Sequence, residues 1–92
     1  MAPTSPGNTV NAMRVLVVED DRETAEFLRR SLTESGHAVE TADDGARGLE
    51  LARKQAWDVI IVDRMLPSLD GLSVIEKLRG EGSRTPVLIL SA

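Results

Sequence analysis

Residues 58–67 constrain the fold of this chain more than any other stretch, and they read DVIIVDRMLP. Four consecutive β-branched residues lead directly into Asp63. A short run that is apolar on both faces predicts a central strand of a parallel sheet, covered on both sides. In such sheets, ligands bind beyond the carboxyl ends of the strands. Asp63 is therefore expected at the edge of the sheet where ligands bind.

The rest of the chain alternates between strand and helix patterns around this stretch. Strands are predicted over residues 14–18, 37–42 and 87–90, and amphipathic helices over about 22–35, 46–55 and 72–80. The segment 37–42 is only half apolar, as expected near a sheet edge. Strands alternating with helices predict parallel βαβ units with right-handed crossovers, so the fold class is α/β.

Length and composition narrow the classes of function. Ninety-two residues form one domain at most. Acidic residues outnumber basic ones by 15 to 11, for a net charge of −4, which argues against a nucleic-acid surface on this chain. The chain has no cysteine, no apolar run of about 20 residues and no signal-peptide pattern at its N-terminus. We therefore expect a cytoplasmic protein without membrane contact.

Residues 1–12 contain Pro3 and Pro6 among Thr, Ser, Gly and Asn. This breaker-rich composition predicts a disordered N-terminal tail. The folded domain is then expected over residues 13–92.

Functional groups follow three of the predicted strands. Glu19 and Asp20 follow the first strand, Asp63 the central strand and Ser91 the last. If the strands are parallel and adjacent, these groups converge at one edge, where carboxylates repel one another and recruit a cation. Oxygen ligands without histidine or cysteine favour a hard ion such as Mg²⁺. An aspartate beside such an ion can attack a phosphoryl group.

Simpler interpretations exist for each residue alone. An aspartate after a strand is commonly a turn residue, and an acidic pair before a helix is commonly a cap. Polar groups at the ends of three strands together indicate a functional site more specifically than any one of these residues does alone. A dinucleotide-binding βαβ unit is disfavoured because no Gly-x-Gly-x-x-Gly follows the first strand, where Glu-Asp-Asp would repel a pyrophosphate.

Four motifs together resemble the receiver domain of two-component response regulators. They are VLVVEDD at 15–21, DVIIVDRMLP at 58–67, DG at 70–71 and PVLILSA at 86–92. The resemblance implies a flavodoxin-like parallel sheet of order 2-1-3-4. The RMLP form, combined with the Glu-Asp pair, is most similar to regulators with a winged-helix DNA-binding output domain.

The resemblance also implies a role for individual residues. Asp63 would be the phosphoacceptor for a sensor histidine kinase. Asp20 would bind Mg²⁺ directly, Glu19 through a water molecule, and Met65 through its backbone carbonyl.

Two further roles follow at the end of the chain. The hydroxyl of Ser91 would be the switch group that turns toward the phosphoryl group, and the backbone amide of Ala92 would hold a phosphoryl oxygen. A receiver of this kind is not an enzyme, apart from self-phosphorylation and autodephosphorylation.

A complete receiver is similar to this chain followed by a helix, a strand and a helix. The fifth strand of the family carries a lysine and an aromatic residue, so we expect a receiver truncated after its fourth strand. Two functions stay open: a phosphoryl-accepting receiver, and a non-switching scaffold or dimerisation fragment that binds Mg²⁺ but is not efficiently phosphorylated. An open apolar edge at residues 87–90 predicts homo-oligomers, and DNA would be contacted only through the output domain.

Overall fold

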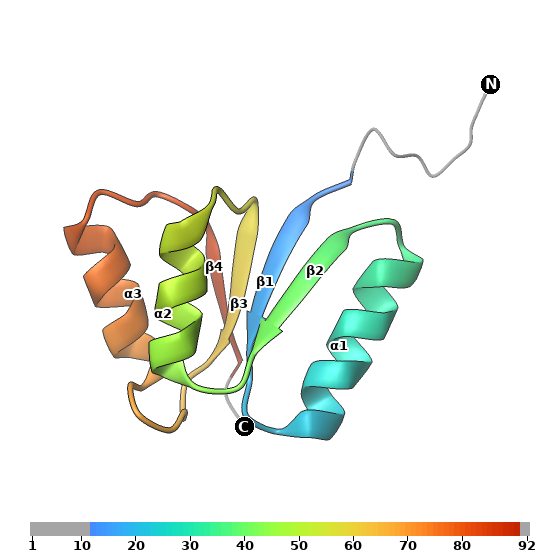
Figure 1. Ribbon diagram of the computed structural model, residues 1–92, viewed down its shortest axis with the longest axis horizontal. Helices are drawn as coiled ribbons and strands as arrows, with labels where there is room; N and C mark the ends of the chain where they lie inside the picture. Colours follow the sequence, from blue (N-terminus) through green and yellow to red (C-terminus); the bar gives the residue numbers. More distant parts are fainter. Residues whose placement is uncertain (1–11, 91–92) are drawn as a thin grey trace.

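A computed structural model of the chain describes residues 12–90, which form a parallel sheet of four strands with three helices (Figure 1). The elements in chain order are β1 (Arg14–Val18), α1 (Arg22–Glu34), β2 (Ala38–Ala42), α2 (Gly45–Lys54), β3 (Val59–Asp63), α3 (Gly71–Gly80) and β4 (Val87–Leu90). The predicted alternation of strands and helices is confirmed. The prediction of a disordered tail lies outside the described residues except at Ala12.

The sheet has the order β2-β1-β3-β4, as the resemblance implied. All its pairings are parallel, and β1 lies between β2 and β3. Val18, the last residue of β1, is in register with Val62, and Asp63 is in register with Leu90 of β4. The strands therefore end together, which brings the residues that follow β1 and β3 to the same edge. The weakly apolar strand β2 forms one edge of the sheet, as predicted.

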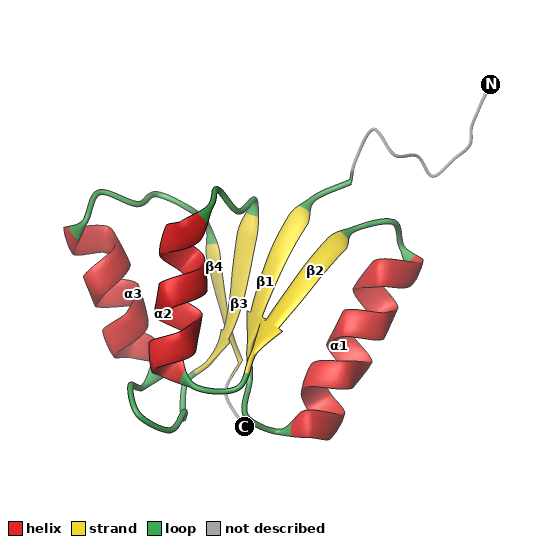
Figure 2. Ribbon diagram, viewed as in Figure 1, coloured by secondary structure: helices red, strands yellow, loops and turns green. Residues whose placement is uncertain are grey.

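Helices cover both faces of the sheet (Figure 2). On one face α2 and α3 pack over a cluster that includes Leu16, Val18, Ile60 and Val62. On the other face, Leu28 and Leu32 of α1 pack against a smaller cluster of Val15, Val17 and Ile61. The alternation of neighbouring strand residues between the two clusters confirms that β1 and β3 are covered on both sides.

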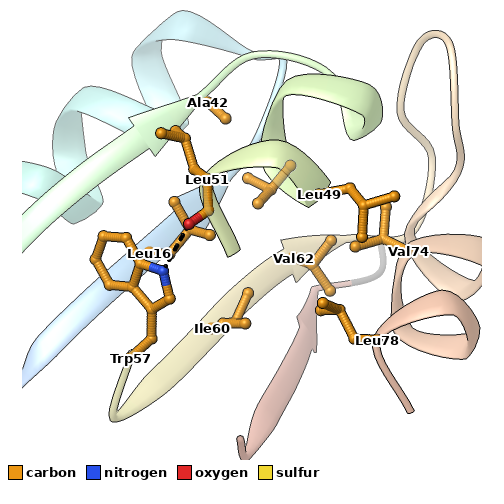
Figure 3. Packing of buried hydrophobic residues seen from close by; sticks show 10 residues of the cluster. Leu16, Ala42, Leu49, Leu51, Trp57, Ile60, Val62, Val74 and Leu78 are labelled. Carbon is orange, nitrogen blue, oxygen red and sulfur yellow. Dashed lines mark hydrogen bonds between the residues drawn. The ribbon is translucent and has the colours of Figure 1, made fainter. Parts of the chain in front are cut away.

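The larger cluster fixes α2 against the sheet (Figure 3). Leu49 and Leu51 of α2 are buried in it together with Trp57, whose indole Nε1 donates a hydrogen bond of 3.0 Å to the Leu51 carbonyl. Because Trp57 directly precedes the turn into β3, this bond ties the end of α2 to the start of the central strand. Trp57 is thus a packing residue at the entrance to β3.

An aspartate caps the N-terminus of each helix. Asp21, Asp44 and Asp70 accept hydrogen bonds from the amides of the third residue that follows each of them, which satisfies one of the free donors of the first turn.

Within residues 12–90, no helix has the length and apolar character needed to cross a membrane.

Candidate functional site

Three carboxylates meet at the edge where β1 and β3 end. Carboxylate oxygens of Glu19, Asp20 and Asp63 all lie within 4.8 Å of one another. Glu19 and Asp20 directly follow β1, and Asp63 is the last residue of β3. The predicted convergence of these three side chains is confirmed, and its cause is the parallel register of the two neighbouring strands.

Glu19 is the buried member of this acidic cluster, with 6% of its surface exposed. Its backbone amide donates to the Ala42 carbonyl at 2.9 Å, which extends the pairing of β1 with β2. Its Oε2 accepts a hydrogen bond of 3.0 Å from the amide of Asp21. Burial raises the pKa of Glu19, and the carboxylates of Asp63 and Asp20 raise it further, against the lowering effect of the Asp21 amide. The cluster thus holds more negative charge than its surroundings stabilise.

The other two carboxylates are open to solvent. Asp20 is exposed and Asp63 is half-buried. A hollow of about 750 Å³ adjoins Glu19 and Asp20, with walls that come from α1, the end of β2, α2 and Pro67. A solute can therefore approach the cluster from the side of this hollow.

The loop between β3 and α3, residues 64–70, begins directly at the cluster. The amide of Met65 donates to Asp63 Oδ1 at 3.3 Å, so the Met65 backbone lies beside the Asp63 carboxylate. The amide of Gly71 donates to the Arg64 carbonyl at 3.0 Å and closes the loop. Only glycine fits there, because a Cβ at position 71 would lie 2.3 Å from the Asp63 carbonyl oxygen.

The same loop also contacts the N-terminus of α2. Gly45 donates its amide hydrogen to the Pro67 carbonyl at 3.1 Å, and Ala46 donates its own to Ser68 Oγ at 3.1 Å. Sequence analysis assigned no role to Ser68. The dipeptide Asp44-Gly45 signals a turn and a helix start, but no pattern indicates that the loop after Asp63 would lie against this helix.

Two of the residues predicted for the site, Ser91 and Ala92, lie outside the described residues. The described chain reaches this edge through β4, whose Leu90 accepts a hydrogen bond of 3.1 Å from the Arg64 amide, directly after Asp63. The roles of Ser91 and Ala92 stay predictions.

The chemistry of the cluster fits a hard divalent cation. All three side chains offer oxygen, and no other group of three or more acidic, histidine or cysteine side chains gathers in this way within residues 12–90. Carboxylates held this close are stabilised when a cation neutralises them. Mg²⁺ is typically held by one or two carboxylates together with water and phosphate oxygens.

Comparison with known proteins decides the family. The family described as response regulator receiver domain matches residues 15–92. This chain belongs to that family. The prediction of a receiver with a flavodoxin-like sheet of order 2-1-3-4 is thereby confirmed.

Individual relatives agree with this assignment. The response regulator MprA of Mycobacterium leprae is 46% identical over 80 residues, which make up 87% of this chain and 35% of that protein. The receiver domain of the Francisella response regulator 1452 has a TM-score of 0.85 and 41% identity, with 87% of this chain and 66% of that chain covered. The receiver chain thus spans about a third of the length of its MprA relative.

A second similar structure holds a metal. The response regulator TrrA of Thermotoga maritima, solved in complex with Mg²⁺ and BeF, has a TM-score of 0.80 and 30% identity, with 86% of this chain and 69% of that chain covered.

Proposed function

We propose that this receiver accepts a phosphoryl group on Asp63 from the phosphohistidine of a sensor histidine kinase. The observation that carries the proposal is the acidic cluster, in which Asp63 lies within 4.8 Å of Glu19 and Asp20. Carboxylates this close repel one another, and a helix cap needs only one of them, so capping alone does not explain the cluster.

The reaction needs a nucleophile that is held in place and can be reached. Asp63 continues the central strand, is half-buried, and has one carboxylate oxygen next to the Met65 amide. In the proposed step, a carboxylate oxygen of Asp63 forms a bond to phosphorus while the bond between phosphorus and the histidine nitrogen breaks. The imidazole that leaves takes up a proton, and an aspartyl phosphate remains.

The proposal assigns a Mg²⁺ ion to Glu19, Asp20, Asp63 and the backbone carbonyl of Met65. When bound, the ion supplies positive charge that stabilises the charge on the transferred phosphoryl group. Ser91 and Ala92 complete the proposal, with the Ser91 hydroxyl turning toward the phosphoryl group and the Ala92 amide holding one of its oxygens.

The signal would then pass to an output domain. The matched region makes up 35% of the MprA relative, so that protein has room for a further domain. We include in the proposal that the phosphorylated receiver controls a DNA-binding output domain and thereby regulates transcription.

Phosphorylation from phosphoramidate tests the proposed reaction. Wild type and Asp63→Asn are incubated with the donor in Mg²⁺ or in EDTA, and the phosphoryl group is counted by intact mass. We expect one group that hydroxylamine removes, as it does from an acyl phosphate, on wild type only with Mg²⁺, and none on Asp63→Asn. If wild type remains unlabelled at every Mg²⁺ concentration, the proposal is wrong, and the non-switching fragment that binds Mg²⁺ becomes the better account.

The open edge of the sheet supports a second proposal, that two copies of this chain pair along β4. Within the described residues β4 pairs only with β3, and it carries no charge. Its Leu88 and Ile89 are 59% and 46% exposed, on opposite faces of the strand. Uncharged open edges favour pairing with another strand, and an identical strand is always available.

Sedimentation tests this second proposal. It should show a dimer at micromolar concentration that Leu88→Lys weakens. A wild-type monomer over that concentration range would contradict the proposal.

A further inference from the structure

The loop between β3 and α3 is attached to α2 by bonds that the proposed function does not use. A helix begins with amide groups that have no partner inside the helix. In α2, the side chain of Asp44 accepts a hydrogen bond from the amide of the third helical residue, and its backbone carbonyl accepts one from the amide of the fourth. The first two amides, of Gly45 and Ala46, donate instead to the Pro67 carbonyl and to Ser68 Oγ, both in the loop.

The hydroxyl of Ser68 makes two of these connections at once. It accepts from the Ala46 amide at 3.1 Å and donates to Asp44 Oδ1 at 3.2 Å. Asp44 is the residue that caps α2. One hydroxyl group therefore joins the loop both to the first turn of the helix and to its cap.

Ser68 adopts an unfavourable backbone conformation to reach this position. Its φ is +67°, and it is the only residue other than glycine within residues 12–90 with a positive φ. This left-handed region is sterically disfavoured for a residue with a Cβ. Such an outlier persists where its surroundings hold it, and it is a reason to look for a function.

The helix and the loop also touch directly. A Cβ at Gly45 would lie 1.6 Å from the Leu69 carbonyl oxygen and 2.9 Å from Leu69 Cβ. Leu66 and Leu69 of the loop pack against the larger core cluster. Residues 66–69 of the loop are thus held by α2 and by the core. Residues 64 and 65 connect them to Asp63.

We infer that Ser68 is a positioning residue for the divalent cation, an inference that rests on the proposed function. Met65, whose carbonyl is the proposed ligand, lies between Asp63 and Ser68 and is 75% exposed, so its own side chain does not fix it. The bonds of Ser68 hold this segment in one conformation. Without them the loop spends time in other conformations, and the apparent affinity falls with the fraction that is competent to bind.

Binding of Mn²⁺ alone, followed by the electron paramagnetic resonance signal of the free ion, tests this inference. Mn²⁺ favours the same oxygen ligands as Mg²⁺. We expect Ser68→Ala to raise the dissociation constant roughly tenfold, as the loss of two hydrogen bonds of ordinary net strength would do. Ser68→Gly, which relieves the left-handed strain and so protects folding, should weaken binding to a similar degree.

Ser73→Ala is the matched control. Its hydroxyl donates to a cap aspartate, Asp70 Oδ2, at 3.1 Å, but makes no link to α2. This variant should bind Mn²⁺ as wild type does, even if its melting temperature falls.

The outcomes separate this inference from the proposed function. If wild type binds Mn²⁺ and the folded Ser68→Ala and Ser68→Gly variants bind it equally well, Ser68 has only a structural role and the inference is overturned. If wild type itself binds no Mn²⁺, the proposed cation site and the inference fall together.

Discussion

The acidic cluster lies between two walls that are built differently. One wall is α1, which has no buried residue and is capped by its own Asp21. The other wall is α2, which buries Gly45, Gly48, Leu49 and Leu51 and is bonded to the loop after Asp63. The side of the site that carries Asp63 is therefore fixed by packing, whereas the α1 side is attached through a stripe of half-buried leucines. Substitutions should have unequal effects on the two walls.

The largest difference in lost stability is expected between alanine substitutions of two glycines, one at each helical wall. Gly45→Ala should destabilise the fold by about 3 kcal/mol or more, because its Cβ would meet the Leu69 backbone at 1.6 Å. Gly36, at the end of α1, has a φ of +95° but nothing within 4 Å of an added Cβ. Gly36→Ala should cost only about 1–2 kcal/mol, from conformation alone. Chemical denaturation measures both, and equal losses would contradict the contrast between the walls.

Substitution of one leucine on each wall by alanine should also cost more stability on the α2 side than on the α1 side. Leu49 of α2 is 6% exposed in the larger cluster, whereas Leu32 of α1 is only partly buried. Leu49→Ala should cost about 3 kcal/mol through lost burial and a cavity. Leu32→Ala should cost about half as much, because water can reach the space it leaves. A larger loss for Leu32→Ala in urea unfolding would show that α1 carries more of the core than its burial indicates.

Much of this architecture could be predicted because it depends on period and topology. The β-branched runs that end in Glu19 and Asp63 predicted neighbouring buried strands, and parallel pairing then required their acidic ends to meet. The amphipathic stripes predicted the helices to within one or two residues at most ends. The family resemblance predicted the order of the strands.

The contact between the loop and α2 could not be predicted in this way. Nothing in Pro67-Ser68-Leu69 signals a positive φ, for which glycine or asparagine would be typical. Ser68 reaches that conformation because Ala46 and Asp44, more than twenty positions earlier, supply its partners. The contact also requires glycine at position 45. Because glycine is equally common in a turn before a helix, its presence does not signal the contact.

The smallest expected effect concerns the charge of Glu19. Because burial and the neighbouring carboxylates raise its pKa above the ordinary value of 4.5, the folded state holds the proton more tightly than the unfolded state. The free energy of unfolding should therefore fall as the pH rises from about 4.5 through the raised value. Glu19→Gln, measured in EDTA, should melt above wild type at pH 7, and the difference should shrink toward pH 4.

Glu34→Gln is the control for this effect, since Glu34 is exposed at the end of α1. It should change the melting temperature little at either pH. If Glu19→Gln destabilises the chain equally at both pH values, the fit of this buried side chain, and not its charge, dominates.

The central claim is that the ends of β1 and β3, between the two walls, bring Glu19, Asp20 and Asp63 into a cluster that a divalent cation stabilises. Titration of the melting temperature with Mg²⁺ tests it most directly. At about tenfold excess over the dissociation constant, wild type should gain roughly 1.4 kcal/mol, or several degrees. Asp43→Ala, which removes an exposed carboxylate from the same hollow, should keep this gain, and Asp20→Ala should lose it. A wild-type melting temperature that does not respond to Mg²⁺, or a gain that survives in Asp20→Ala, would contradict the account.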